Sequence, residues 1–376
     1  MMQHISRALA ALLLTFTLTI AGAAPALAKS YILYSGSYTA GTSKGIYAFR
    51  FDSKDGALSP LGFVAETPQP AHLWIAPNRK TLYAVNWEAQ GGVSAFRIDP
   101  KTAKLTFLNR VSSHGASPNQ VVLDPSGRIA VTVNYITGNL AAFKVLPDGS
   151  LTEAFYLDQH TGTPLPGGQP GPRAHGIEFT KDGRTMFITE LGLDRVYTYR
   201  VDAKVPSITP ADPAFVSTHG GAGPRRAQLS PDSRFLYVNH ETDAEVSVFA
   251  VSDGKLSEVQ TLSTLPAGST VKNMTSEIII DRAGRHLYVA NRGHDSIAVY
   301  TIDKATGRLT HDSNVSSGGA TPRNIRLDPT GGYLLASNEN GGSIKVLKVD
   351  KTTGALTPTA NAVEINTPGG LYFLSK

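Results

Sequence analysis

The chain of 376 residues contains no cysteine and carries a formal net charge of +5 at pH 7. The lack of cysteine excludes disulfide bonds, thiol catalysis and cysteine metal sites. The basic residues are scattered through predicted turns and form no basic run, so we expect no nucleic-acid partner. The 36 glycines and 23 prolines separate short apolar segments, which favours an all-β fold.

Residues 1–28 have the pattern of a secretory signal peptide. His4 and Arg7 precede an apolar run, and small residues then lead to an A-x-A cleavage pattern that ends at Ala28. The apolar run is too short to span a bilayer comfortably, and no later segment is a transmembrane candidate. We therefore expect a mature protein that begins at Lys29, is periplasmic or secreted, and does not insert into the membrane.

From Lys29 onward, one pattern recurs about every 50 residues: a strand, a tight turn, a second strand with a polar end, and further alternating strands. The residue before the tight turn marks six copies: Pro77, Pro125, Lys181, Pro231, Arg282 and Pro329. The copy that begins at His72 predicts strands at residues 72–76, 81–86, 92–98 and 105–111. This period, with several short strands per copy, is typical of a β-propeller with one four-stranded sheet per blade.

The first blade lacks its innermost strand. Residues 31–37, 46–51 and 58–65 fit its other strands, and residues 367–374 repeat the pattern of residues 321–328, the first strand of the last full copy. We therefore predict that the C-terminal strand completes blade one and closes a seven-bladed ring, which would remove unpaired sheet edges. The chain is then a signal peptide, residues 1–28, followed by one propeller domain, residues 29–376.

One connection is longer than the others. Residues 160–172 are rich in Gly and Pro, which favours neither a helix nor the interior of a sheet. We expect this insertion to be a loop that lies over one face of the ring.

The repeat also indicates where functional side chains would gather. The start of each innermost strand and the end of the next strand should meet at one face, because the two strands form an antiparallel hairpin. The strand-start position holds Ala71, Asn119, His175, Arg225, Ser276 and Arg323. The two strand-end positions hold Asn86, Asn134, Glu190, His240, Asn291 and Asn338, then Trp87, Tyr135, Leu191, Glu241, Arg292 and Glu339. Arginines, a histidine and carboxylates are thus expected at the mouth of a central channel.

Polar residues at such a mouth can also be structural. We interpret the recurring strand-end asparagines as turn formers, because asparagine tolerates positive φ. His175, Arg225 and Arg323 occupy positions where Gly or Ala would satisfy the backbone, which favours a functional role over inter-blade ion pairing. Three further residues allow either interpretation equally: Glu190, Glu241 and Arg292. No pair of histidines has metal-ligand spacing such as H-x-x-x-H, so no metal site is predicted.

Several motifs of the repeat carry a more specific resemblance. They are Gly171-Pro172-Arg173-Ala174-His175, Gly221-Ala222-Gly223-Pro224-Arg225, the segment from His286 to Ile297, and Thr321-Pro322-Arg323-Asn324. Together with residues 34–39 and 45–47, they resemble the seven-bladed propeller lactonase family, which includes a group of 6-phosphogluconolactonases and fungal carboxymuconate cyclases. The similarity covers nearly all of residues 31–374, and its motifs follow the order of the blades.

The resemblance implies four catalytic residues at the ring face: His175, Arg225, Glu241 and Arg323. Two positions depart from the family pattern, which often has His-Ala-His where this chain has Arg173-Ala174-His175, and Gly-Pro-Arg-His where it has Gly-Pro-Arg225-Arg226. The added arginines favour a more anionic ligand. Four residues are predicted to contact the substrate: Arg173, Arg226, Glu190 and Arg292.

We therefore expect an exported lactonase that hydrolyses a sugar or carboxylated lactone by water attack. His175, assisted by Glu241, would act as the general base. Arg225 and Arg323 would stabilise the oxyanion or hold a substrate carboxylate or phosphate. Because 6-phosphogluconolactone arises in the cytoplasm, export favours another sugar or carboxylated lactone.

Two alternatives stay open, a non-enzymatic ligand-binding or scaffold propeller and a lactonising cyclase of the muconate type. The fold by itself does not decide among these classes. For the lactonase we expect a monomer that needs no cofactor and takes a small anionic or sugar lactone as its partner.

Overall fold

The computed structural model describes residues 29–39 and 41–375. The predicted signal peptide, residues 1–28, lies outside the described residues. Every regular secondary-structure element assigned in the described part of the chain is a β-strand, which confirms the all-β prediction. No helix there has the length and hydropathy that a membrane span would need.

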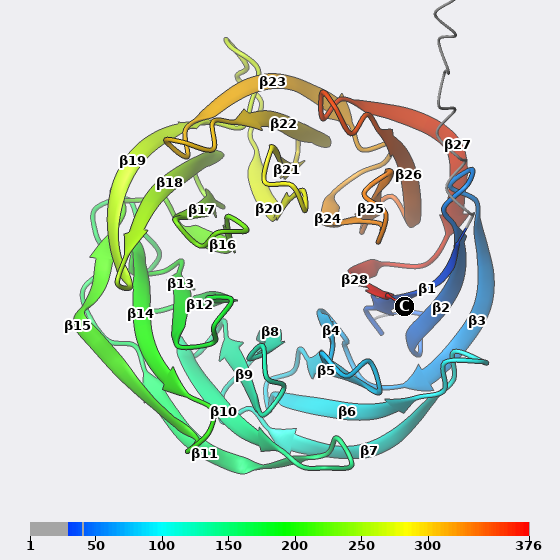
Figure 1. The fold of residues 1–376 in the computed structure, drawn as a ribbon, viewed down its shortest axis with the longest axis horizontal. Helices are drawn as coiled ribbons and strands as arrows, with labels where there is room; N and C mark the ends of the chain where they lie inside the picture. The colour runs from blue at the N-terminus through cyan, green and yellow to red at the C-terminus, as the bar shows by residue number, and fades with distance from the viewer. Residues whose placement is uncertain (1–28, 40, 376) are drawn as a thin grey trace, which may run out of the picture.

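Seven four-stranded antiparallel sheets surround a central axis (Figure 1). The strands are β1 (Ser30–Ser37), β2 (Gly45–Asp52), β3 (Leu58–Glu66), β4 (Leu73–Ile75), β5 (Thr81–Asn86), β6 (Gly92–Ile98), β7 (Leu105–Ser112), β8 (Pro118–Leu123), β9 (Ile129–Asn134), β10 (Asn139–Val145), β11 (Leu151–Gln159), β12 (Ala174–Phe179), β13 (Thr185–Glu190), β14 (Arg195–Asp202), β15 (Ser207–Ser217), β16 (Pro224–Leu229), β17 (Phe235–His240), β18 (Glu245–Ser252), β19 (Lys255–Ser263), β20 (Met274–Ile280), β21 (His286–Arg292), β22 (Ser296–Ile302), β23 (Leu309–Ser316), β24 (Pro322–Leu327), β25 (Tyr333–Asn338), β26 (Ser343–Val349), β27 (Leu356–Glu364) and β28 (Pro368–Leu374). In every blade one strand lies next to the axis, and the others follow outward in sequence order.

The ring closes as predicted, because β28 pairs with β1 in a sheet of order β28-β1-β2-β3. Leu33 lies opposite Phe373, and Tyr34 lies opposite Tyr372. The ring of Phe51 packs edge-on against Phe373 at 5.4 Å, so the closing strand is also fixed by side-chain packing. The N-terminal and C-terminal strands therefore share one sheet, and that sheet has a neighbouring blade on each side.

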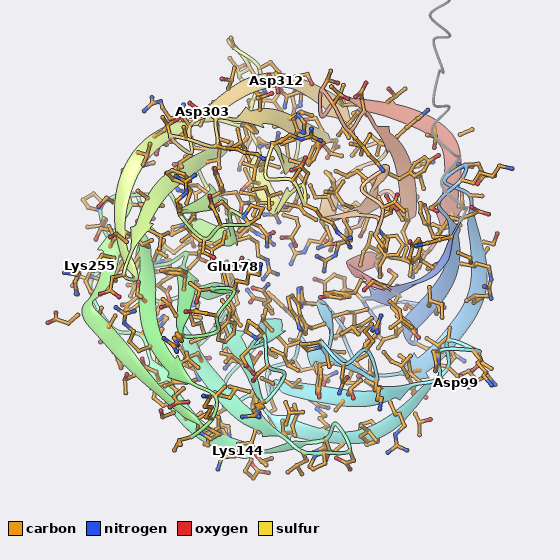
Figure 2. The ribbon with its side chains drawn as sticks, in the orientation of Figure 1. Asp99, Lys144, Glu178, Lys255, Asp303 and Asp312 are labelled. Carbon is orange, nitrogen blue, oxygen red and sulfur yellow. The ribbon has the colours of Figure 1, made fainter. Side chains whose placement is uncertain are left out.

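The hydrophobic core is divided among the gaps between neighbouring blades. Each second strand from the axis has both faces packed, so β5, β9, β13, β17 and β25 are buried at every residue. The outermost strands, such as β7 and β11, consist mainly of exposed and half-buried residues. Charged side chains such as Lys144, Lys255 and Asp312 lie at the outer edge of the ring, whereas Glu178 is an ionisable residue near its centre (Figure 2).

An aspartate at the end of the innermost strand holds some of the tight turns, including those after β8 and β24. Asp124 Oδ1 accepts hydrogen bonds from the backbone N–H groups of Arg128 and Ile129, at 2.8 and 2.7 Å. Gly127 completes the turn at φ 71°, in the left-handed region that Gly adopts without strain. Where the sequence is Asp-Pro-x-Gly, at residues 124–127 and 328–331, the same hydrogen bonds recur and give hairpins of equal length.

The insertion at residues 160–172 forms no helix or strand, as predicted. It connects β11 to β12 and packs against the segment before β16, where Gly167 lies within van der Waals distance of Gly221. Asp194 holds that neighbouring segment by accepting hydrogen bonds from the backbone N–H groups of Gly221 and Gly223, at 2.9 and 2.8 Å. The insertion therefore borders the start of β12, which carries His175.

Candidate active site

A β-bulge at the start of the innermost strand sets the direction of the key side chains. The pairing of β12 with β13 skips His175, and the same register shift skips Arg225 on β16 and Arg323 on β24. A bulge turns its extra residue out of the regular alternation. As a result Arg225 and Arg226, although adjacent in sequence, both line the central cavity, whereas a regular strand would send them to opposite faces.

The mouth of the channel holds a cluster of ionisable side chains around one carboxylate. Glu241 Oε2 accepts a hydrogen bond from Arg225 Nε at 2.6 Å and forms an ion pair with Arg292 Nη2 at 2.9 Å. His175 Nε2 lies 4.0 Å from the same oxygen. Arg225 also donates to the backbone carbonyl of Ser276. Side chains from three neighbouring blades thus meet at Glu241, although they are far apart in sequence.

The electrostatics of this cluster set the protonation of its two central groups. Burial by itself would raise the pKa of Glu241, but Arg225, Arg292 and Arg323 together lower it below its ordinary value. Burial lowers the pKa of His175 well below its ordinary value, and the same arginines lower it further. At neutral pH the site therefore contains an ionised carboxylate and a neutral imidazole.

The cavity below this cluster is narrow, with a volume of about 10 Å³, which is room for about one water molecule. Its lining residues are Tyr38, Ala71, His72, Asn119, His175, Arg225, Arg226, Glu277, Arg323, Asn324 and Gly370. A larger hollow, which includes Arg50 and Lys101, lies at the opposite ends of the strands and lacks carboxylates and histidines. The convergence of cations, a carboxylate and an imidazole therefore favours the central cavity as the site of chemistry.

Deeper in the channel, Arg226 is held by the protein itself. Its guanidinium donates to the backbone carbonyls of His175 at 3.2 Å and Asn119 at 3.1 Å, and its Nε lies 3.9 Å from Glu277 Oε2. Glu178, near the centre of the ring in Figure 2, has its pKa raised to about 8 by burial, with Glu277 adding to the effect. A carboxyl group with that pKa is mostly protonated at neutral pH and so cancels little of the positive charge.

The rim of the mouth is aromatic. Trp87 stacks on Tyr135 at 5.7 Å, and Tyr135 meets the ring of His175 edge-on at 5.6 Å. The Arg173 guanidinium lies 5.6 Å from the Tyr135 ring and donates to the backbone carbonyl of Ile136 at 2.7 Å. Arg173 therefore lies at the rim, where an incoming ligand would pass it.

Glu190 is not brought to this mouth. Its side chain is fully buried, and it accepts hydrogen bonds from His160 Nδ1 at 2.7 Å, Gly192 N–H at 3.2 Å and the backbone N–H of Arg173. These bonds tie the ends of the insertion to β13. Glu190 therefore differs from the other seven residues singled out in the sequence, all of which lie in or beside the cavity.

The strand-end asparagines are structural, but not for the predicted reason. None of Asn86, Asn134, Asn291 and Asn338 has a positive φ. Each is buried and donates through Nδ2 to a backbone carbonyl of the segment that connects the preceding blade, for example Asn134 to Ser113 at 2.8 Å. The amides therefore hold inter-blade connections in place, a role that only the arrangement of blades reveals.

Three residues of the site were assigned no role from the sequence. Trp87 and Tyr135 were predicted to lie at the mouth, and Tyr38 was noted only as part of the motif at residues 34–39. Tyr38 follows β1, and β1 is the second strand of blade one, so the residue occupies the strand-end position of that blade. The alignment of blade one with the others would have found it.

Comparisons with known proteins agree with this fold. The family described as Lactonase, 7-bladed beta-propeller, matches residues 32–373. A 6-phosphogluconolactonase of Bacillus subtilis (strain 168) is 36% identical over 297 residues, which cover 78% of this chain and 84% of that protein. The solved structure of the periplasmic gluconolactonase PpgL of Pseudomonas aeruginosa is 33% identical, has a TM-score of 0.88, and is matched over 92% of this chain and 99% of that one. The chain therefore belongs to the seven-bladed β-propeller lactonase family and is, by class, a lactone hydrolase.

Proposed function

We propose that the protein is an exported lactonase that hydrolyses an anionic sugar lactone or another carboxylated lactone at the mouth of the central cavity. The observation that carries the proposal is the cluster in which His175 and Glu241 lie beside Arg225 and Arg292 at the cavity mouth. Relatives named for 6-phosphogluconolactone and gluconolactone support a sugar-derived substrate.

His175 is the proposed general base. Its neutral imidazole takes a proton from a water molecule as the water oxygen forms a bond to the lactone carbonyl carbon. The carboxylate of Glu241, 4.0 Å from Nε2, stabilises the imidazolium that results. The tetrahedral intermediate then breaks its ring C–O bond, and the imidazolium returns the proton to the departing alkoxide. Atoms and charge balance, and the product is a hydroxy acid.

Arg323 is the proposed ligand for the substrate's negative charge. Arg225 and Arg292 are both paired with the Glu241 carboxylate and so serve mainly to position it. The guanidinium of Arg323 is held less tightly, since its Nε lies 3.6 Å from Glu339 Oε2, beyond a good hydrogen bond. Its donors are available to a substrate carboxylate, a phosphate or the developing oxyanion.

A negative substrate would also adjust the base. The arginines that lower the pKa of His175 in the free protein would be partly neutralised by a bound anion, so the pKa of His175 should rise on binding. A pKa closer to the working pH makes a better general base. The arginine-rich cavity therefore supports a preference for anionic lactones in rate as well as in affinity.

Export is part of the proposal. The signal-peptide pattern at residues 1–28 supports it, as does the periplasmic location in the name of the Pseudomonas relative. Cell fractionation and N-terminal sequencing of the mature protein test it directly. A mature chain that begins at Lys29 and is found outside the cytoplasm is the expected result, and an unprocessed cytoplasmic chain would contradict it.

The activity is tested by a pH-indicator assay of the mature protein against δ-gluconolactone, its 6-phosphate and an uncharged δ-valerolactone. We expect acid release above the spontaneous rate, fastest for the anionic lactone, and lost in His175→Ala. His114→Asn is the matched control, because His114 is an exposed histidine at φ 54°, a conformation that asparagine accepts.

The outcome separates the functional classes. Lactone hydrolysis that persists in His175→Ala would overturn the proposed mechanism. A protein that hydrolyses no lactone but is stabilised by an anionic lactone in a thermal-shift assay would be a binding propeller. Ring closure of an unsaturated dicarboxylate, without hydrolysis of any lactone in the panel, would indicate a cyclase.

A further inference from the structure

A second cluster of potential ligands lies in blade five, outside the central cavity. His219 belongs to the segment between β15 and β16, His240 ends β17, Asp243 lies in the following turn, and Glu245 begins β18. The side-chain ligand atoms of all four lie within 4.8 Å of one another. The segment before β16 brings His219 back over the β17–β18 turn, which sequence spacing could not indicate.

The individual distances are those of a compact site. His219 Nε2 lies 2.5 Å from Asp243 Oδ2 and 3.7 Å from Glu245 Oε2. His240 Nδ1 lies 3.6 Å from the same Asp243 oxygen. Ligands of a tetrahedral zinc ion are separated by about 3.3 Å, which follows from bond lengths near 2.0–2.2 Å. The His219–Glu245 and His240–Asp243 separations are already close to that value. The half-exposed His219 side chain can move to widen the third separation, between His219 and Asp243.

The buried histidine is the observation that points to a ligand. The side chain of His240 is 0% exposed, and within the described part of the chain neither of its ring nitrogens has a hydrogen-bond partner. A buried imidazole without a partner is unfavourable, and such groups are nearly always satisfied in folded proteins. Its Nδ1 faces the carboxylate of Asp243, so a cation between them would satisfy both groups.

We propose that His219, His240, Asp243 and Glu245 bind a divalent transition-metal cation of the Zn²⁺ class. Two imidazoles and two carboxylates suit Zn²⁺ and similar first-row metals. Mg²⁺ and Ca²⁺ prefer sites built of oxygen ligands alone and should bind poorly. The partial exposure of His219, Asp243 and Glu245 gives the ion access from solvent, while His240 anchors the site in the blade.

The position of the site gives it a role in the cavity as well. Glu241 lies between His240 and Asp243 in sequence, so a bound metal would brace the turn from which Glu241 reaches Arg225 and Arg292. This consequence rests on the proposed function, whereas the metal site itself does not. The metal is a positioning element in this scheme and does not contact the substrate.

The test is titration of tag-free, chelator-treated mature protein with ZnCl₂ by calorimetry and with CoCl₂ by visible absorption. We expect one ion per chain, the absorption bands of low-coordinate Co²⁺, and a higher thermal midpoint with Zn²⁺ than with Mg²⁺. His219→Gln and Asp243→Asn should each weaken binding by more than about 10-fold. Both residues are partly exposed, so these variants avoid the folding risk of replacing the buried His240. His114→Asn should bind as the wild type does.

Two results would overturn the proposal. One is the absence of Zn²⁺ and Co²⁺ binding by the folded wild-type protein, and the other is unchanged binding in both ligand variants. Metal binding is measured without a lactone, so its failure is distinguishable from a failure of the proposed lactonase activity. Lactone turnover with and without the ion then shows whether the braced turn affects catalysis.

Discussion

Two of the buried histidine–carboxylate pairs have opposite surroundings. In the insertion, His160 Nδ1 lies 2.7 Å from Glu190, its Nε2 lies 2.9 Å from the Tyr199 hydroxyl, and its ring stacks on Tyr197 at 4.0 Å. At the mouth, His175 Nε2 lies 4.0 Å from Glu241, and its Nδ1 has no hydrogen-bond partner in the described part of the chain. The first pair is saturated, whereas the second is not.

The difference teaches how the same residue types serve structure or chemistry. Both ring nitrogens of His160 are occupied, so it holds the end of the insertion and has no ring nitrogen left to contact a ligand. The imidazole of His175 is kept neutral by burial and by the surrounding arginines, and it borders a cavity. The histidines of both pairs are buried, so burial does not distinguish them. They differ because His175 Nδ1 has no hydrogen-bond partner in the described part of the chain and because arginines surround its ring.

The largest expected effect separates the two pairs by activity. His175→Ala should lower kcat/KM for an anionic lactone by about 10²- to 10⁴-fold, because a general base contributes that range. Its thermal midpoint should stay close to that of the wild type, since its side chain has few polar contacts to lose. Steady-state kinetics and a melting curve check both statements. A large loss of stability with normal turnover would assign His175 to structure.

The converse is expected for the pair in the insertion. His160→Ala should lower the free energy of unfolding by about 3–5 kcal/mol, because it leaves the buried Glu190 carboxylate without its partner. Urea denaturation measures this loss. The folded fraction of this variant should keep a kcat within about 3-fold of the wild-type value, in contrast to the large loss expected for His175→Ala. An inactive but fully stable variant would place His160 in the chemistry instead.

A smaller effect is expected from Arg323, the arginine that is held least tightly at the mouth. Arg323→Leu should reduce kcat/KM about 10- to 100-fold for an anionic lactone and much less for an uncharged one, because a charged hydrogen bond to substrate is lost. Arg97→Leu is the control, since Arg97 is exposed on β6, away from the cavity. Equal losses for charged and uncharged lactones would argue against a role in anion binding.

The smallest effect is a shift in pH dependence. Hydrolysis needs the deprotonated imidazole, so it is retained above the pKa of His175 and lost as pH falls through it. Because that pKa is lowered in the free protein, kcat/KM should persist below about pH 6.5, the ordinary histidine value. The acid limb of kcat should lie at higher pH than that of kcat/KM, since the bound anion raises the pKa.

The pH profiles are best measured by chromatography of the product with a carboxylated lactone, which stays anionic above about pH 5. His175→Ala should lack the acid limb. A kcat/KM limb at or above about pH 6.5 in the wild type would contradict the electrostatics described for the free site.

Much of the fold follows from local sequence. The spacing of the tight turns, the alternation of apolar residues, and the similarity of residues 367–374 to residues 321–328 predicted seven blades and their closure by the C-terminal strand. These features are local because a blade repeats one hairpin geometry with turn residues at constant offsets. The strand-start and strand-end positions also placed His175, Arg225, Glu241 and Arg323 at one face.

Other features depended on packing between blades. Glu190 has the same repeat position as residues of the mouth, yet the insertion covers it and supplies His160 as its partner. The asparagine amides reach connecting segments that local pattern does not bring near. Side-chain direction at a bulge depends on a register shift, and alternation along a strand does not reveal that Arg225 and Arg226 share the cavity.

The sequence by itself therefore determined the number of blades, the closing strand and the set of positions at the mouth, because these follow from periodicity and turn chemistry. Only the tertiary structure decided which polar residues are saturated and which remain available. That distinction depends on contacts between residues distant in the chain, such as Arg292 with Glu241 and His219 with Asp243. Those contacts form when the ring closes and fixes the distances between neighbouring blades.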